Sequence, residues 1–196
     1  QTRTAMIGLK IDGRDIIRAG NMLAAAGDKA PLAIVRALRH TGDKARTQMR
    51  RATAKQLGPI RSSTGGPYAI AKKAINGQVV GMSYVIKSKG GNIRLRFYRP
   101  KETRKGVKHG SPKRERLVVG AFLHGGRFPN RHGGPHGGLG VYRRTGPGRF
   151  PLTAERSNVW IPEEMMSGGS ASAFFKTAEH ELGERLAHEL LRILGG

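Results

Sequence analysis

Histidine and glutamate, two residue types that often carry catalysis or bind metals, recur at regular spacing in the C-terminal segment. His180, Glu184 and His188 are four residues apart, so they would stack along one face of a helix. The zinc-protease motif H-E-x-x-H begins with His180-Glu181, but it requires a histidine where Glu184 stands. We therefore interpret the three residues as contacts with solvent or with another subunit, and the pattern predicts no hydrolase.

Three further histidines, His124, His132 and His136, fall in the glycine-rich segment 124–140. That segment holds no carboxylate and no cysteine, whereas a structural zinc site usually takes four protein ligands. We expect an extended loop there rather than a metal site. The sequence also lacks the P-loop pattern GxxxxGK[ST] and the G-x-S-x-G elbow. We therefore expect no metal, no cofactor and no enzyme activity.

A basic segment, Lys87–Arg116, holds twelve Lys or Arg residues and two Glu residues, a net charge of +10. Such a segment suits a sequence-independent contact with a phosphate backbone, docking on an acidic protein, or plain solvation. The candidate contacts with DNA or an acidic partner are Arg94, Arg96, Arg99, Lys101, Arg104, Lys105, Lys108, Lys113 and Arg114. The helix expected over residues 31–57 adds a second basic set, which we interpret as an interface face: Arg36, Arg39, Arg46, Arg50, Arg51 and Lys55.

The stretch Leu139–Pro162 combines aromatic, proline and arginine residues in an extended pattern. Prolines on both sides argue against a central strand, because proline has no N–H to donate to the ladder. We expect a rigid edge shaped for contact between subunits, with candidate residues Val141, Tyr142, Arg143, Phe150, Trp160, Ile161 and Pro162. Trp160 is either an anchor in a neighbouring subunit or a cap on the chain's own core.

The sequence predicts an α+β fold to position these residues: an antiparallel β-sheet flanked by a long N-terminal helix and a long C-terminal amphipathic helix. Residues 1–30 predict a strand and a short helix over 14–26, residues 31–57 a long helix, and residues 67–76 a further helix. The sheet is expected within residues 78–162, with a turn at Lys89–Asn92, a basic loop over 99–116 and a glycine- and histidine-rich loop over 124–140.

Alternation predicts a half-buried strand over Ile93–Tyr98 whose outer face carries Arg94, Arg96 and Tyr98, and the apolar run Leu117–Leu123 predicts an interior strand. The last helix, over 170–194, has an apolar stripe of Phe175, Ala178, Leu182, Leu186, Leu190 and Ile193.

Composition bounds the remaining alternatives. The 196 residues suit one domain with long loops, since glycine is abundant (29 residues) and apolar residues make up 37% of the chain. There is no cysteine, which suits assembly in a cytosol, and no apolar run approaches the ~20 residues that a membrane span needs. The formal net charge of +23 makes the isolated chain repel itself and attract polyanions.

The order of several sequence blocks resembles the minor tail protein Z, or tail completion, family of long-tailed bacteriophages. The blocks are the run Ala37–Arg46, Gly120-Ala121-Phe122, Gly140–Arg144, Arg149–Leu152, Trp160-Ile161-Pro162 and the amphipathic helix at the C-terminus. The insert Pro100–Arg116 and the loop 125–138 have no counterpart in that pattern.

The resemblance implies a virion structural protein, located in the tail or neck and assembled in the host cytoplasm. It implies a homo-oligomeric ring, expected to be a hexamer, at the head-proximal end of the tail, which would join the tail tube or terminator to neck proteins. Genomic DNA passing nearby is a further expected partner, and no membrane is expected. Six copies would multiply the charge of +23 sixfold, so acidic neighbours or nucleic acid must compensate it.

The alternative hypothesis is a basic nucleic-acid-binding protein of ribosomal character. Its support is the basic, glycine-rich composition and the arginine-bearing strand. Against it, Tyr98 would be the lone aromatic residue on the outer face of that strand, where a stacking platform would need more.

Overall fold

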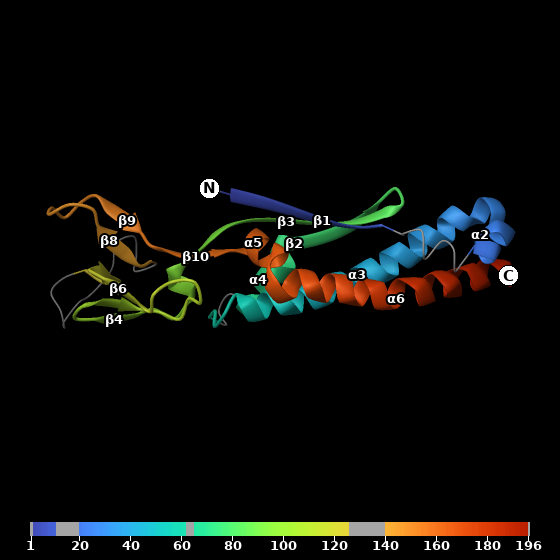
Figure 1. Cartoon of the computed structure of the whole chain (residues 1–196). Coiled ribbons are helices and arrows are strands. Elements are labelled where there is room, and N and C mark those ends of the chain that lie inside the picture. Colours follow the sequence, from blue (N-terminus) through green and yellow to red (C-terminus); the bar gives the residue numbers. More distant parts are fainter. Residues whose placement is uncertain (1, 11–19, 62–64, 126–139, 196) are drawn as a thin grey trace.

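The computed structural model describes residues 2–10, 20–61, 65–125 and 140–195. Figure 1 shows an elongated α+β molecule with a helical body, a sheet lying on that body, and a smaller group of strands at one end. We call that group the β-lobe; it comprises residues 99–125 and 140–156. The expected fold class, antiparallel sheet structure between a long N-terminal and a long C-terminal helix, is confirmed.

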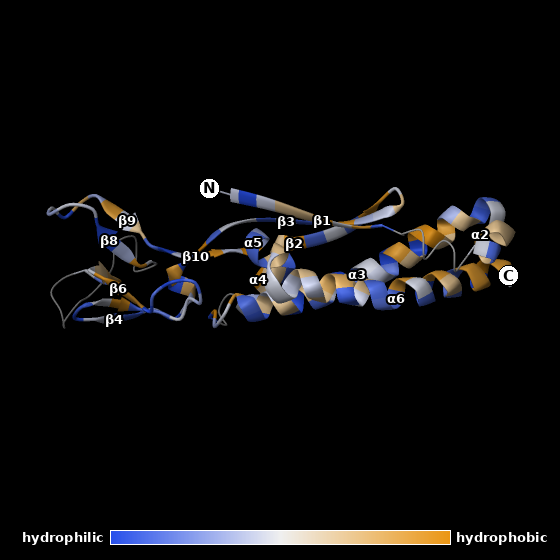
Figure 2. Ribbon diagram, in the orientation of Figure 1, coloured by the Kyte–Doolittle hydropathy of each residue, from blue (hydrophilic) through white to orange (hydrophobic). Residues whose placement is uncertain are grey.

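The helical body is an antiparallel pair of long helices, α3 (Ala30–Gln56) and α6 (Gly168–Leu194), with the short α2 (Gly20–Ala26) and the 3-10 turn η1 (Gly27–Lys29) at one end (Figure 1). Pro31 lies in the first turn of α3, where its missing N–H is not needed. The buried stripe of α6 runs through Phe174, Ala178, Leu182, Leu186 and Leu190. Leu186 and Leu190 cluster with Ala33 and Ala37 of α3, whereas Phe174 and Ala178 belong to the larger core cluster that includes Ala45 and Met49 of α3. Figure 2 shows the apolar stretches of both helices gathered toward the α2 end.

The stripe expected on α6 was wrong by one residue at its start. Phe174 is fully buried, whereas Phe175 is 44% exposed. Positions 174, 178, 182 and 186 recur every four residues, and burial in a two-helix contact follows that spacing.

The main sheet is built around the twelve-residue strand β3 (Ser83–Arg94). The strand β1 (Thr2–Lys10) pairs with β3 along one edge. The strands β2 (Ile75–Val80) and β10 (Arg156–Trp160) share the other edge, β2 opposite Ser83–Ser88 and β10 opposite Asn92 and Arg94. All pairings are antiparallel, and the helices cover one face of the sheet.

One local expectation for this sheet was wrong. The chain turns at Gly81-Met82, where Val80 pairs with Ser83, and Lys89–Asn92 continues β3 instead of forming a turn. A glycine inside a strand often marks close approach by another element. Here a Cβ on Gly90 would stand 3.6 Å from Ile161, at the start of the helix α5 (Ile161–Met166).

The helix expected at residues 67–76 is α4 (Gly66–Ala74), and the chain enters β2 directly after it. The remaining strands form two three-stranded sheets in the β-lobe. One contains β4 (Lys101–Thr103), β5 (Gly106–Lys108) and β6 (Leu117–Val119). The other contains β7 (Ala121–Phe122), β8 (Tyr142–Arg144) and β9 (Leu152–Ala154).

The single interior strand expected over Leu117–Leu123 was therefore wrong. Gly120 adopts φ 70°, a left-handed conformation that glycine takes without steric cost, and there the chain passes from β6 into β7 of the second sheet.

Contact between the sheet and the helical body is organised by Tyr84 of β3. Its ring is fully buried between two glycines, Gly42 of α3 and Gly77 of β2, and its hydroxyl donates a hydrogen bond to Asp43 Oδ1 at 2.5 Å. A Cβ on Gly42 would lie 2.3 Å from Tyr84 Cγ, so no larger residue fits there without displacing the ring. Burial, with the hydrogen bond to Asp43, raises the pKa of Tyr84, and the hydroxyl keeps its proton.

Gly42→Ala should destabilise the protein. Alanine favours an exposed helix by about 1 kcal/mol over glycine, but overpacking a filled core costs about 1–3 kcal/mol or more. Because Cγ is the root of the ring and has little freedom to move, we expect net destabilisation by urea unfolding. Gly8→Ala on β1, where no other atom lies within 4 Å of the added Cβ, is the matched control with little effect. An increase in stability for Gly42→Ala would contradict the packing described.

Candidate polyanion interface

The β-lobe concentrates positive charge at one end of the molecule. Its described residues include twelve Lys or Arg and three Glu, a surplus of nine positive charges. Six of the nine basic candidates are exposed and form no ion pair with a carboxylate among the described residues: Arg94, Arg99, Lys101, Arg104, Lys105 and Lys108. Arg94 lies at the end of β3, next to the lobe, and the other five lie in it.

The β4–β5 hairpin places two like charges directly opposite each other. Lys101 of β4 pairs with Lys108 of β5, and both side chains are exposed. The turn between the strands adds Arg104 and Lys105. Like charges directly opposite on paired strands are destabilising, so this arrangement is unfavourable for folding alone and would be relieved by a bound anion.

Two other candidates, Lys113 and Arg114, serve a structural role in this fold. Lys113 forms an ion pair with the buried Glu164 of α5. Arg114 Nη2 lies 2.7 Å from Oε2 of the buried Glu155, and its Nη1 donates to the Arg156 backbone carbonyl at 2.5 Å. A buried carboxylate is costly unless it is paired, so these two cations hold the loop 109–116 on β10 and α5.

The expectation that Arg96 and Tyr98 lie on the outer face of a strand was wrong. The strand ends at Arg94, and Leu95–Phe97 form the 3-10 turn η3. The Arg96 guanidinium stacks on Phe97 at 4.6 Å from the ring centre, and the ring of Tyr98 is fully buried. Burial raises the pKa of Tyr98. Tyr98 therefore packs in the core and offers no stacking surface for a base.

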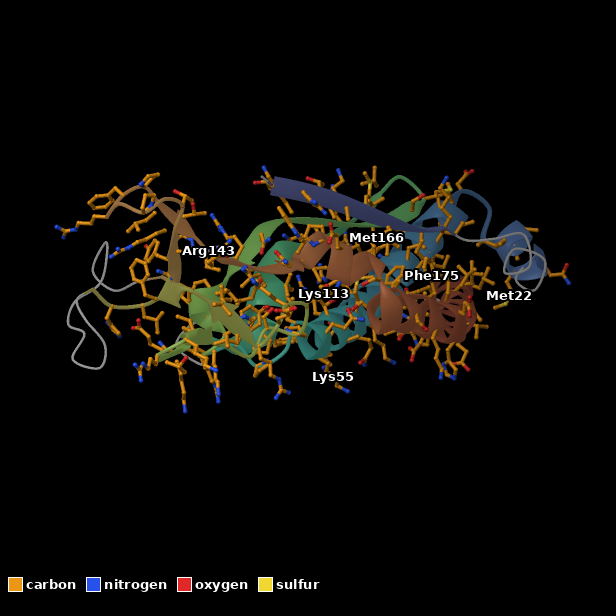
Figure 3. The ribbon with its side chains drawn as sticks, turned by 60° about the vertical axis from the view of Figure 1, so that its left-hand side comes forward. Met22, Lys55, Lys113, Arg143, Met166 and Phe175 are labelled. Atoms are coloured by element: carbon orange, nitrogen blue, oxygen red, sulfur yellow. The ribbon has the colours of Figure 1, made fainter. Side chains whose placement is uncertain are left out.

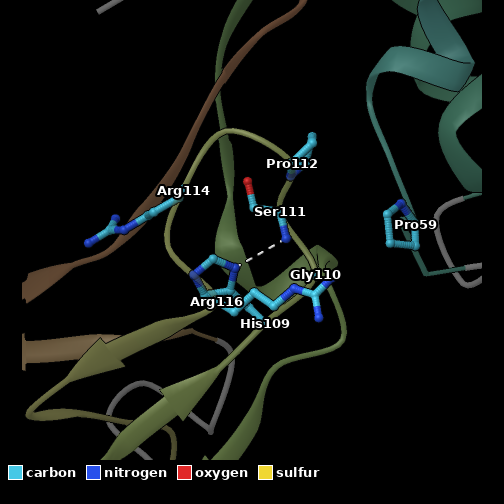
Figure 4. A pocket seen from close by; sticks show the side chains of 7 residues that line it. All are labelled: Pro59, His109, Gly110, Ser111, Pro112, Arg114 and Arg116. Carbon is cyan, nitrogen blue, oxygen red and sulfur yellow. Dashed lines mark hydrogen bonds between the residues drawn. The ribbon is translucent and has the colours of Figure 1, made fainter.

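Loop 109–116 also holds a buried histidine beside a surface cleft of about 480 Å³ (Figure 4). His109 Nδ1 accepts a hydrogen bond from the Ser111 backbone N–H at 3.1 Å, and Ser111 Oγ donates to the Ser157 carbonyl at 2.9 Å. Burial lowers the pKa of His109, Arg114 lowers it further, and the Glu115 backbone acts in the opposite direction. His109 is therefore a neutral, structural residue of the junction between lobe and body.

A second cleft, of about 470 Å³, lies in the β-lobe itself. The β4–β5 turn supplies Arg104 and Lys105 to its wall, and β8 supplies Arg143 and Arg144. Phe122 of β7 also lines this cleft, and the Arg144 guanidinium lies 5.8 Å from the centre of its ring. The sequence analysis assigned Arg143 to a subunit contact, and it named Arg144 and Phe122 only within the blocks of the family resemblance, without a binding role. Their meeting could not be predicted, because segments about 40 residues apart come together only in the folded lobe.

The candidate residues for subunit contact separate into buried and exposed groups. Val141 and Ile161 are 2% and 6% exposed, and Pro162 is buried in the first turn of α5. These three pack in the chain's own core, so the expectation that they face another subunit was wrong. The reason is that α5 begins at Ile161, and proline fits the first turn of a helix.

The other four subunit-contact candidates lie at or near the surface. Phe150 is 66% exposed, and Tyr142 and Trp160 are partly buried. The guanidinium of Arg3 lies over the Trp160 ring at 4.2 Å, so β1 covers part of that ring. Arg143 is exposed and pairs with Glu155 at 2.8 Å; Figure 3 shows it out on the lobe, whereas Lys113 lies at the junction.

Helix α3 uses two of its basic residues inside the molecule. Arg50 Nε donates to the Ile75 carbonyl at 3.0 Å, and Arg46 Nη1 donates to the Gly77 carbonyl at 3.1 Å. These bonds satisfy carbonyls on β2, so Arg46 and Arg50 stabilise the sheet, contrary to their interpretation as interface residues. Arg39, Arg51 and Lys55 remain exposed.

The histidine patterns do not converge on a metal site within the part of the chain that the structure describes. His180, Glu184 and His188 are exposed on α6, and His124 is exposed beside the lobe cleft. His132 and His136 lie outside the described residues. Among described residues, no three His, Asp or Glu side chains are close enough together to hold a metal ion.

Fold and surface together define a basic α+β protein with a body of two antiparallel helices and a cationic β-lobe. No protein-family model, no curated protein and no solved structure matches the chain. Within the described ranges, none of the helices is both long enough and apolar enough to cross a bilayer.

The buried His109 should make stability depend on pH. Folding lowers the pKa of His109 from its ordinary value of 6.5. Below about pH 6.5 the unfolded chain therefore protonates this imidazole more readily than the folded chain does. Stability is fully present above that pH and falls as pH drops toward the folded pKa. His109→Asn keeps the Nδ1-like acceptor and should reduce the loss in Tm between pH 7.5 and 5.5. His180→Asn, at an exposed position, is the control; an unchanged pH profile in His109→Asn would contradict the burial argument.

Lys108→Glu should raise Tm slightly, because it places a negative charge opposite Lys101 where the wild type has a like charge. It should also weaken retention on a heparin column, because the surface loses positive charge. Lys89→Glu on β3, which faces Thr4, makes the same change in net charge without relieving a like-charge pair. Thermal unfolding at low salt compares the two variants. Equal shifts in Tm for both would show that the Lys101–Lys108 repulsion is unimportant.

Proposed function

We propose that this chain is a bacteriophage structural protein of the tail completion type, which works by assembly and contact and has no catalytic role. In this proposal it forms a homo-oligomeric ring, with six copies expected, at the head-proximal end of the tail. There it joins the tail tube or terminator to neck proteins, with genomic DNA as a further contact. The order of the sequence blocks supports this family, and the long helices at both ends of the chain are compatible with it.

The observation that carries the proposal is the set of exposed cations on the β-lobe that form no ion pair with a carboxylate among the described residues. Five of these cations, Arg99, Lys101, Arg104, Lys105 and Lys108, lie between β3 and loop 109–116. A free protein with this charge repels itself, and an assembly of several copies repels itself more strongly. A large virion joint, in which acidic neighbours or DNA lie against the lobe, provides the compensation.

Two further surfaces support contact between copies. The β8–β9 hairpin carries the exposed Phe150 on its connecting segment, at the far end of the lobe from the helices (Figure 1). The strand β1 pairs with β3 alone, so its other edge carries no strand from the described residues. A free edge is a template for a strand of another chain.

The second candidate is a cellular nucleic-acid-binding protein of ribosomal character. The observation that favours it is the aromatic residue Phe122 beside Arg144 in the lobe cleft, since base stacking uses such pairs. This function would require neither a ring nor tail proteins.

Native mass spectrometry and sedimentation should separate the two candidates. The tail completion proposal expects an oligomer that persists in moderate salt, or that forms on mixing with purified tail tube, terminator or neck proteins. Phe150→Ala should weaken the oligomer or the mixed complex while leaving Tm unchanged, because the side chain contributes little to the monomer's core.

Met82→Ala, at an exposed apolar residue of the β2–β3 turn, is the matched control and should assemble as the wild type does. A monomer at all concentrations, with and without those partners, would rule out the tail completion proposal. If that monomer binds nucleic acid and loses it steeply with salt, the second candidate replaces the first.

A further inference from the structure

We propose that the lobe cleft lined by Arg104, Lys105, Arg143 and Arg144 is a binding site for the phosphodiester backbone of a nucleic acid. This inference rests on the polyanion contact within the proposed function and assigns that contact a place and a chemistry. Acidic protein is the competing partner, and the experiment below treats it as an outcome.

Three segments distant in sequence form the cleft. The β4–β5 turn contributes Arg104 and Lys105, the Gly120 turn joins the two lobe sheets, and β8 contributes Arg143 and Arg144. Four cationic groups therefore converge on a space of about 470 Å³. Scattered surface charge, the usual outcome for a basic segment, does not produce a concave site of this kind.

Most of this charge is available to a ligand. Of the four cations, only Arg143 forms an ion pair with a carboxylate among the residues that the structure describes, with Glu155 at 2.8 Å. Arg144 contacts the ring of Phe122, and a guanidinium on an aromatic face still presents its N–H groups at the edges. Lys101 and Lys108, opposite each other on the same hairpin, extend the positive surface.

The shape of the cleft favours a nucleic acid. Gly120 lines it, and the space where a Cβ would stand there has no other atom within 4 Å; at Gly106, which also lines it, the Val118 backbone fills that space. A backbone without side chains lets a phosphate group approach closely. The partly buried Phe122 adds a face on which a base stacks, which an acidic peptide does not need.

The test is fluorescence anisotropy with a labelled 20-nucleotide oligo-dT and with a 20-base-pair duplex, over a range of NaCl concentrations. The triple variant Arg104→Ala, Lys105→Ala, Arg144→Ala removes three charges from the cleft. The control variant Lys72→Ala, Lys73→Ala, Lys176→Ala removes three exposed charges from α4 and α6. Circular dichroism checks that both variants stay folded.

We expect the cleft variant to bind oligo-dT at least about tenfold more weakly, with the slope of log K against log salt reduced by about 2. The control variant should lose much less. Phe122→Leu, which keeps an apolar side chain, should weaken binding of oligo-dT more than binding of the duplex, because only the single strand offers free bases for stacking.

Equal losses in the two triple variants, or no binding by the wild type, would overturn the inference. So would competition by poly-glutamate of matched charge as effective as competition by unlabelled oligo-dT, since that would identify acidic protein as the partner. The native mass of the wild type and of the cleft variant separates the two proposals: a wild-type cleft that binds DNA in a chain that never assembles upholds the site and rejects the tail role.

Discussion

The position of the β-lobe depends on buried carboxylates held by cations from loop 109–116. Glu155 lies between Arg114 and Arg143, and Glu164 pairs with Lys113. A buried carboxylate without its partners would be strongly unfavourable, so each ion pair constrains the segments that supply it. Glu155 thereby joins loop 109–116 to β8, and Glu164 joins that loop to α5 of the body. The strand β10 runs between these two points, and the cationic hairpin β4–β5 is presented at the end of the molecule as a result.

The helical body provides the rigid support for this arrangement. Tyr84 is fully buried against Gly42 and Gly77, and Arg46 and Arg50 bind carbonyls of β2. These contacts fix the main sheet on α3, and β3 then leads directly into the lobe. Close packing against glycine leaves little room for adjustment, so the main sheet has a defined place on α3.

The positive charge of the chain thus divides into two parts with different physical roles. Arg46, Arg50, Lys113 and Arg114 bond to carbonyls or carboxylates of the chain itself and stabilise the fold. The cations of the β4–β5 hairpin and its turn have no such partners among the described residues and include a directly opposed pair. The hairpin is therefore electrostatically unfavourable within the chain, and local conflicts of this kind occur in natural proteins mainly at functional surfaces. The proposed roles in tail assembly and in nucleic-acid contact both rest on that surface, and they differ in which partner would cover it.

Local sequence pattern alone was enough to predict the α+β class and the two long helices, whose ends were placed to within a residue or two at most boundaries. It also identified the basic character of residues 87–116. Both are possible because helical periodicity and net charge depend only on neighbours in sequence. It failed at Lys89–Asn92 and Leu117–Leu123, where glycines signal the approach of α5 in one case and a change of sheet in the other. It also misplaced Tyr98, Ile161 and Pro162, whose burial depends on elements far away in sequence. Which cations are paired, and which converge on a cleft, was decided only by tertiary structure, since the carboxylates and arginines concerned lie about 40 residues apart along the chain and meet through folding.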